Sequence, residues 1–334
     1  MPREWVIDSY DGFEGLRLQT CDILTPRASE VRLRIEAFAL NWGDNDLMED
    51  KYSFSFSGFP ARIGMEATGI VEAIGTNVNG IAVGDRYCTL PYFYDRQGAS
   101  ADTLIIDQAY VTKAPEGLTA VEASSVWMQF MTAYFPIVEI AKAAPGCNIL
   151  VPAGTSTAGS AALQIGRMHG ANMISTTRSE SNRQTVLDSG ADHVFVDEGG
   201  DIETFLRDAT DGVGVHCSFD PVGGEFMERY ANAMAKSGKL ILYGGLSGTY
   251  SNPPFLPMIQ NSLWFHAYSL FNYVEDADAC ARGKEFVYRS LAEGNLRPCV
   301  DQVFQMDGYV DAWRYLKGPR KTYGKVVIET GAHQ

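Results

Sequence analysis

The chain has 334 residues, of which 46% are apolar and 20% are charged, a composition that favours a globular fold over wholesale disorder. Its net charge of −14 argues against a nucleic-acid partner and against attachment to an anionic membrane, because both favour basic surfaces. At roughly 150 residues per domain, the length predicts two domains. The sequence contains no apolar run of about 18 residues and no apolar signal segment at the N-terminus, so we expect a soluble, cytoplasmic protein.

The first 120 residues have the pattern of short strands and turns. Val31–Ala37 alternates polar and apolar residues, which is typical of a half-buried strand, and Gly69–Gly75 is a second candidate strand. Val83–Tyr87 is a turn that leads into another. This part of the chain predicts a β-rich barrel or sandwich.

From about residue 118 to residue 270, helical and strand patterns alternate. A long helical stretch over Ala120–Ala143 is interrupted at Pro136, and a buried strand over Asn148–Ala153 precedes a helix over Ala158–His169. Further strands are expected at Asn172–Thr176, His193–Val196, Val215–Phe219 and Lys239–Tyr243. This alternation predicts βαβ units and a parallel sheet. A helix over Ala277–Glu293 and a strand over Gly324–Ile328 follow.

The segment Ala153–Gly159 connects the first of these strands to a helix and is rich in small residues. Aligned with the pattern G-x-G-x-x-G, it has Gly154 and Gly159 at the outer positions and Ser156 at the middle one. Backbone N–H groups at such a helix N-terminus attract a dinucleotide pyrophosphate, although the same kind of turn also occurs in purely structural βαβ units. We assign the turn to cofactor binding through Gly154, Thr155, Ser156, Thr157, Ala158 and Gly159.

The end of the next strand indicates which dinucleotide is preferred. A site for NAD usually has an acidic residue there, whereas this chain has Arg178, followed by Arg183. A guanidinium suits the 2′-phosphate of NADPH, and the hydroxyls of Thr177 and Ser179 can add to the same cradle. The alternative is that both arginines are ordinary solvated side chains at a helix start.

Several landmarks of the sequence, taken in order, resemble the medium-chain dehydrogenase/reductase superfamily, and specifically its zinc-free, quinone-oxidoreductase-like branch. The resemblance covers nearly the whole chain and rests on Asn41–Asp44, Gly64–Gly69, Val83–Arg86, Thr132–Tyr134, Ala153–Gly159, Gly190–Asp192 and Gly324–Val327. It implies an α/β architecture in which a Rossmann doubly wound parallel sheet domain, residues 119–270, is inserted in a β-rich, GroES-like catalytic domain, residues 1–118 and 271–334. It also implies an active site in the cleft between the domains and a homodimer formed through residues 262–270.

The zinc-ligand positions of this superfamily carry other residues here. The Cys of the first landmark is replaced by Asn41 and the His of the second by Met65, and the third position falls on Met128. None of these is a good zinc ligand. Glu66 remains without a neighbouring His, and the four-cysteine structural-zinc lobe is missing, with only Cys88 between residues 86 and 115. The remaining cysteines are scattered without ligand spacing, so we expect no metal and no disulfide framework.

The resemblance places Asn41 and Tyr52 at active-site positions. The Asn41 amide can polarise a carbonyl, and the Tyr52 phenol can donate a hydrogen bond or a proton to an enolate. Asp44 is a candidate for orienting these neighbours. Turn capping by Asn41 and Asp44, and rim packing by Tyr52, are the structural alternatives.

Further cofactor contacts follow from the resemblance. They are Gln129 and Thr132 on the helix beside the nicotinamide, Gly244, Leu246 and Ser247 after the fifth strand of the parallel sheet, Phe271 in the returning segment, and Lys325 near the C-terminus. Aromatic residues in two loops of the first domain predict a pocket for planar substrates: Tyr52, Phe54, Phe56, Phe59, Tyr92, Phe93 and Tyr94.

The sequence therefore predicts an NADPH-dependent, zinc-independent oxidoreductase that delivers hydride to a quinone or to an α,β-unsaturated carbonyl. Two alternatives stay open: an enoyl-thioester reductase on the same scaffold, and a non-catalytic dinucleotide-binding or crystallin-like protein. A CoA carrier favours a basic entrance, which the charge of −14 makes less attractive.

Overall fold

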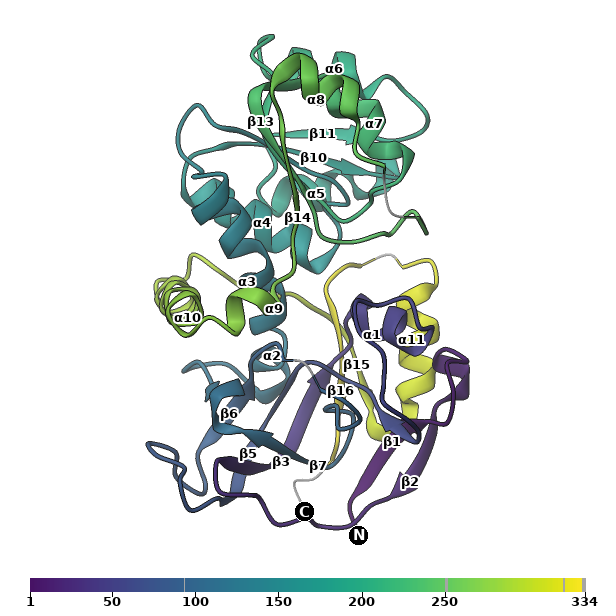
Figure 1. Cartoon of the computed structure of the whole chain (residues 1–334), viewed down its shortest axis with the longest axis vertical. Coiled ribbons are helices and arrows are strands. Elements are labelled where there is room, and N and C mark those ends of the chain that lie inside the picture. Colours follow the sequence, from purple (N-terminus) through teal and green to yellow (C-terminus); the bar gives the residue numbers. More distant parts are fainter. Residues whose placement is uncertain (93, 250–251, 321, 332–334) are drawn as a thin grey trace. The chain divides into compact units, whose positions relative to one another are not determined.

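The computed structural model describes residues 1–92, 94–249, 252–320 and 322–331, and the chain divides into two units (Figure 1). Unit 1 comprises Met1–Met128, Val274–Ala277 and Arg297–Gln334, and unit 2 comprises Gln129–Tyr273 and Asp278–Leu296. Each unit has its own sheet system. Phe93, one of the predicted pocket aromatics, lies outside the described residues.

Unit 1 is built mainly from strands. They are β1 (Arg3–Ile7), β2 (Arg17–Thr20), β3 (Glu30–Ala39), β4 (Ala61–Arg62), β5 (Ala67–Ile74), β6 (Arg86–Thr89), β7 (Thr103–Asp107), β8 (Val111–Lys113), β15 (Val300–Gln305) and β16 (Lys325–Glu329). Its helices are α1 (Trp42–Met48), α2 (Ala120–Ala123) and α11 (Tyr309–Lys317), with short 3₁₀ turns at Phe13–Gly15, Gln108–Tyr110 and Met306–Gly308.

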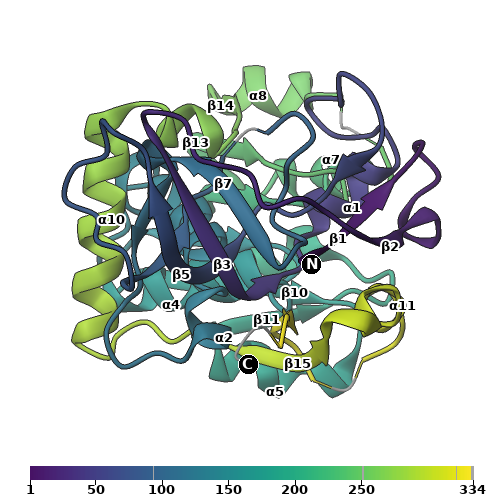
Figure 2. The same ribbon diagram turned by 90° about the horizontal axis from the view of Figure 1, so that it is seen from below.

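The long strand β3 organises unit 1. The predicted alternation over Val31–Ala37 lies within it, and it pairs antiparallel with β5 and β7, between which it lies in Figure 2. Its last residues also pair with β16, so that Val327 lies opposite Ala39. The main sheet has the order β15-β16-β3-β5-β6-β8, and β2-β1-β4 forms a second sheet. Through this topology, the C-terminal strand lies beside the segment that leads into α1.

Unit 2 alternates strands and helices, as predicted. Its strands are β9 (Asn148–Val151), β10 (Asn172–Thr177), β11 (His193–Val196), β12 (Val215–Asp220), β13 (Met234–Leu242) and β14 (Trp264–Ala267). Its helices are α4 (Thr157–Met168), α5 (Arg183–Asp188), α6 (Ile202–Ala209), α7 (Glu225–Ala231) and α8 (Phe255–Asn261), with a 3₁₀ turn at Glu180–Asn182. Three helices cross the boundaries between the units: α3 (Trp127–Tyr134), α9 (Phe271–Val274) and α10 (Ala277–Ala292).

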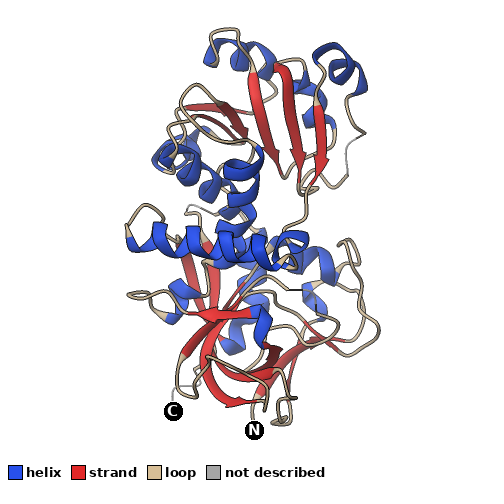
Figure 3. Ribbon diagram, turned by 60° about the vertical axis from the view of Figure 1, so that its left-hand side comes forward, coloured by secondary structure: helices blue, strands red, loops and turns tan. Residues whose placement is uncertain are grey.

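The six strands of unit 2 form one sheet in the order β11-β10-β9-β12-β13-β14, and every pair in it is parallel (Figure 3). Numbered along the chain, this is the order 3-2-1-4-5-6 of the Rossmann fold. Its core includes Leu150, Ile174, Leu206, Tyr230 and Leu240, all fully buried. Because the strands run in one direction, their carboxyl ends share one edge of the sheet, where the loops that carry the predicted cofactor residues begin.

The helical stretch predicted over Ala120–Ala143 is divided into three pieces. After α2, the hydroxyls of Ser124 and Ser125 donate to the carbonyl of Val121, at 2.9 and 3.0 Å, and compete with the helical hydrogen bonds. After α3, Phe135–Ile140 forms a π-helix that contains Pro136, which lacks the N–H that an α-helix needs. The break at Ser124–Val126 was not predicted.

No helix in the described ranges combines the length and apolar character needed to cross a bilayer.

Candidate functional site

The turn after β9 depends on an unusual backbone conformation at Ala153 and on the missing side chain of Gly154. Ala153 has a φ of 54°, a left-handed conformation that is uncommon for a residue with a Cβ. Gly154 donates its N–H to Thr176 at 2.9 Å, and a Cβ on it would lie 2.2 Å from Ser175 Oγ and 2.8 Å from Val186 Cγ1. Only glycine therefore lets the turn pass this close to β10 and α5.

Ser156 is the N-cap of α4. Its hydroxyl accepts the N–H of Gly159 at 3.0 Å, and this satisfies one of the unpaired donors at the helix start. A Cβ on Gly159 would lie 2.7 Å from the carbonyl oxygen of Ala153 and 2.8 Å from Ser156 Oγ. Gly159 thus makes room for the turn itself. Helix α4 has twelve residues after its N-cap Ser156, so the N–H groups of its first turn carry the positive end of a helix dipole.

The end of β10 combines a buried hydroxyl with an exposed guanidinium. Thr177 is buried, and its Oγ1 has no hydrogen-bond partner among the described residues. Arg178 follows immediately and is exposed. Arg183 is already engaged: it forms an ion pair with Glu180, at 2.6 and 3.0 Å, and donates to the carbonyl of Val194 at 2.8 Å. Ser179 shares a hydrogen bond of 2.8 Å with Ser181.

The other cofactor residues predicted in unit 2 lie on three elements. Gly244, Leu246 and Ser247 form the loop after β13, where Leu246 and Ser247 donate N–H groups to Pro221 and Val222 at 2.9 and 3.0 Å. This loop therefore runs along the residues that follow β12. Gln129 and Thr132 lie on α3, where Gln129 is buried, and Phe271 begins α9.

In unit 1, the predicted catalytic residues Asn41 and Asp44 form the first turn of α1. The N–H of Asn41 donates to Asp44 Oδ2 at 3.0 Å. Asp44 is fully buried, and its Oδ1 has no partner in the described part of the chain. Burial raises the pKa of Asp44 to about 7, although the N–H of Asn41 and the nearby ammonium of Lys325 act in the opposite direction. The hydrogen bond from Asn41 N–H to Asp44 Oδ2 caps the start of α1, so the capping alternative for these two residues is present.

A buried ion pair adjoins this turn. Lys325, at the start of β16, is 1% exposed, and its Nζ donates to Glu66 Oε2 at 2.8 Å and to Asn41 Oδ1. Glu66 Oε1 accepts the backbone N–H of Met128 at 2.9 Å. The sequence and its family resemblance marked Glu66 and assigned Lys325 to the cofactor, but they did not predict the ion pair between these residues. The pairing of β16 with β3 is the structural reason why they meet.

Tyr52 lies against the same turn. A Cβ on Gly43 would lie 3.1 Å from Tyr52 Oη, so the glycine after Trp42 lets the phenol approach the helix closely. The sequence marked Gly43 only as part of the landmark Asn41–Asp44, and no pattern there indicates its contact with Tyr52, nine residues further on.

The predicted aromatic residues that the structure describes form a connected cluster. Tyr52 contacts Phe54 with ring centroids 5.4 Å apart, Phe54 contacts Tyr94 at 6.0 Å, and Tyr94 contacts both Phe56 and Tyr92. Phe56 in turn contacts Phe59. The Oη of Tyr94 accepts the N–H of Gly64 at 3.0 Å and so fixes the loop before β5.

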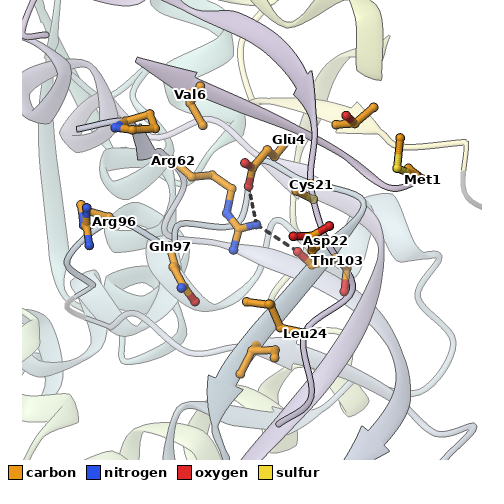
Figure 4. A pocket seen from close by; sticks show the side chains of 13 residues that line it. Met1, Glu4, Val6, Cys21, Asp22, Leu24, Arg62, Arg96, Gln97 and Thr103 are labelled. Carbon is orange, nitrogen blue, oxygen red and sulfur yellow. Dashed lines mark hydrogen bonds and ion pairs between the residues drawn. The ribbon is translucent and has the colours of Figure 1, made fainter. Parts of the chain in front are cut away.

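A separate pocket of unit 1 contains none of the predicted site residues (Figure 4). Buried Arg62 lies on its wall and donates from Nη1 to Glu4 Oε2 and to the carbonyl of Thr103, each at 3.2 Å. Arg96 and Asp22 also line the pocket, so it offers charges of both signs.

The side chains at the superfamily's zinc positions do not suit zinc. Asn41 Oδ1 and both carboxylate oxygens of Glu66 are already hydrogen-bonded, and the buried ammonium of Lys325 would repel a cation there. Met65 offers only a thioether. Within the described residues, no three His, Cys, Asp or Glu side chains are grouped as a metal site would require.

The fold thus combines a GroES-like β unit with a Rossmann unit. Residues 27–116 match the family described as "Alcohol dehydrogenase GroES-like domain", and residues 158–275 match "Zinc-binding dehydrogenase". The two matches together span more than half of the chain. The chain belongs to the medium-chain dehydrogenase/reductase superfamily, a superfamily of oxidoreductases.

Individual relatives are distant but similar over nearly the full chain. The rat synaptic vesicle membrane protein VAT-1 homolog is 24% identical over 98% of this chain and 83% of its own length. A mycocerosic acid synthase-like polyketide synthase of Mycolicibacterium smegmatis is 26% identical over 97% of this chain, which spans only 15% of that protein. The structure of Escherichia coli quinone oxidoreductase complexed with NADPH superposes with a TM-score of 0.91, at 22% identity, and covers 98% of this chain and all of the other.

Proposed function

We propose that this protein is an NADPH-dependent, zinc-independent oxidoreductase that reduces a quinone or a C=C bond conjugated to a carbonyl. The observation that carries the proposal is the end of β10, where Arg178 is exposed beside the buried hydroxyl of Thr177, which has no hydrogen-bond partner in the described ranges. A site for NAD usually has an acidic residue at this point. The NADPH complex of the Escherichia coli quinone oxidoreductase supports the same cofactor.

The residues of unit 2 fit NADPH. The tight turn at Gly154 and the capped start of α4 leave backbone N–H groups for the pyrophosphate. Arg178 would bind the 2′-phosphate, with Thr177 and Ser179 as hydroxyl donors. Arg183 has a lesser share, because Glu180 already holds its guanidinium. The loop Gly244–Ser247, together with Gln129, Thr132 and Phe271, is proposed for the rest of the cofactor.

The chemistry is assigned to the α1 turn of unit 1. Bound NADPH would supply the hydride. Negative charge then develops on the carbonyl oxygen of the acceptor, and an N–H of Asn41 donates to that oxygen. The Tyr52 phenol donates a hydrogen bond or the proton that the enolate requires. Quinones and conjugated carbonyls are electrophilic without a Lewis acid, which agrees with side chains that do not suit zinc.

The aromatic cluster that contains Tyr52 supports a planar acceptor. Aromatic side chains bind flat conjugated molecules by offset or edge-to-face contacts. The more deeply buried members of the cluster, such as Tyr94, have a packing role instead of a substrate-binding one.

Turnover of a substrate panel tests the proposal. Oxidation of NADPH is followed at 340 nm with quinones, conjugated enones, enoyl thioesters and simple alcohols, with and without a zinc chelator. We expect turnover of quinones or enones that the chelator leaves unchanged. Turnover of enoyl thioesters alone would select the alternative reductase, and turnover of alcohols or loss of activity with chelator would refute the mechanism. NADPH binding without turnover of any acceptor would favour the non-catalytic role.

We also propose a homodimer formed through β14. Among the described strands, β14 pairs only with β13, and its Trp264 is 69% exposed. Helix α8, which leads into β14, exposes Phe255, Leu256 and Ile259. An open strand edge beside exposed apolar side chains is suited to pairing with a second copy.

The dimer is tested by replacing Trp264→Lys and measuring mass by sedimentation at micromolar concentration. We expect the wild type to be a dimer and the variant to dissociate at least about tenfold more readily, because the change buries a charge at the interface. Val213→Lys, at another exposed apolar position, is the matched control. A monomeric wild type, or a variant as dimeric as the control, would disprove the interface.

A further inference from the structure

Lys325 is held in an unusual environment for a lysine. It lies at the start of β16, and the hydrogen bond from Leu40 N to the Val326 carbonyl, at 3.0 Å, fixes this strand beside the segment that leads into α1. The register places the lysine next to Asn41, which is 284 residues away in sequence. At 1% exposure, its ammonium is almost entirely removed from water.

Glu66 balances the charge of the buried ammonium. Its Oε2 accepts from Lys325 Nζ at 2.8 Å, and its Oε1 accepts the Met128 N–H at 2.9 Å. Both oxygens are therefore fixed, and the carboxylate cannot rotate without breaking one of these bonds. A buried lysine is tolerated only with such a partner, because an unpaired buried charge is strongly destabilising.

The second acceptor of Lys325 is the side chain of Asn41. An ammonium has only donors, so the atom that faces it must be the amide oxygen. The amide nitrogen then points away from Lys325. Its contact with the Ala39 carbonyl is long, at 3.4 Å, and its interaction with the Asp44 carboxylate is the smallest of the effects on the pKa of that group. The ammonium also draws electron density toward the amide oxygen, which makes the N–H groups better donors.

We propose that Lys325 is a positioning residue, which locks the amide of Asn41 so that its N–H group is presented to the carbonyl oxygen of the acceptor. This rests on the proposed function of Asn41. It differs from the cofactor contact that the resemblance implied for Lys325, and it rests on two partners of the ammonium that lie inside unit 1. Glu66 acts one step further away, by holding the ammonium in place.

The test compares Lys325→Met and Lys325→Arg with Lys325→Met/Glu66→Gln, in which the lost charge is balanced. Lys113→Met, a change of an exposed lysine in the same unit, is the matched control. Three quantities are measured: the Kd for NADPH, the side-chain amide signal of Asn41 in ¹⁵N-asparagine-labelled protein without cofactor, and kcat with the best acceptor.

We expect Lys325→Met to leave the Kd for NADPH within about twofold, to shift the Asn41 amide signal, and to lower kcat by about tenfold to a hundredfold. Lys325→Arg should recover part of kcat, because it keeps a cation near the amide oxygen. The double variant should regain thermal stability without regaining kcat, which separates positioning from simple folding.

Three results would overturn the inference. A Kd for NADPH that rises tenfold or more in Lys325→Met would return Lys325 to the cofactor. An Asn41 signal that matches the control variant would show that Lys325 does not hold the amide. Recovery of kcat in the double variant would show that only stability had been lost. If the wild type turned over no acceptor, the proposed function would fail separately, while the amide signal would still decide whether Lys325 positions Asn41.

Discussion

The turn before α4 and the buried polar cluster beside α1 are built from contacts of different range. In the turn, Ser156 caps a residue three positions away, and Gly154 contacts β10, the next strand of the chain. In the cluster, formed by Asn41, Asp44, Glu66 and Lys325, the bonds of Lys325 span 259 and 284 residues. The first depends on local shape, and the second depends on charges that long-range strand pairing brings together.

The cluster should make the free energy of unfolding depend on pH. With Lys325 and Glu66 charged, an ionised Asp44 would leave a net negative charge in the interior, and burial accordingly raises its pKa to about 7 from about 3.9 in the unfolded chain. Between these values, the folded chain binds a proton that the unfolded chain has released. Stability therefore falls as pH rises through this window, and the loss is complete above about pH 7.

We expect the wild type to lose roughly 3 kcal/mol of unfolding free energy between pH 5 and pH 8 from this group, and Asp44→Asn to abolish most of that slope. Denaturant unfolding at several pH values measures it. Asp8→Asn is the control, because Arg17 holds the pKa of Asp8 below its ordinary value and so keeps its titration outside the window. Equal slopes in the wild type and in Asp44→Asn would show that the cluster does not carry this charge.

The same contrast explains what the sequence could predict. The strand and helix alternation of unit 2 and its phosphate-type turn follow from patterns within about 30 residues, and β9 to β13 were placed within a few residues of their observed bounds, apart from the earlier start of β13. The break after α2 was missed because Ser124 and Ser125 look compatible with a helix until their bonds to Val121 are seen.

In unit 1, the sequence and its family resemblance singled out Asn41, Asp44 and Tyr52 but could not relate them to Glu66 and Lys325. That relation depends on the pairing of β16 with β3, which joins the two ends of the chain. A buried lysine has no local signature, since the residues around Lys325 are those of an ordinary buried strand. The close approach of Tyr52 to Gly43, only nine residues away, was missed for a different reason, because no residue pattern in this segment marks it.

In the turn region, cofactor affinity should depend mainly on the side chain of Arg178 and on the 2′-phosphate of NADPH. Arg178→Ala should weaken NADPH binding by about tenfold to a hundredfold, the equivalent of roughly 1.5–3 kcal/mol for a charge-assisted contact, and leave NADH binding unchanged, since NADH lacks the 2′-phosphate. Arg183→Ala should have a smaller effect, because Glu180 and the Val194 carbonyl already hold its guanidinium. Fluorescence titration with both cofactors measures this, with the exposed, ion-paired Arg207→Ala as the control.

Equal affinity of the wild type for NADPH and NADH would remove Arg178 from the site. A larger loss in Arg183→Ala than in Arg178→Ala would mean that the Glu180 pair opens when the phosphate binds, so that even this local region would depend on a rearrangement that short-range patterns do not encode.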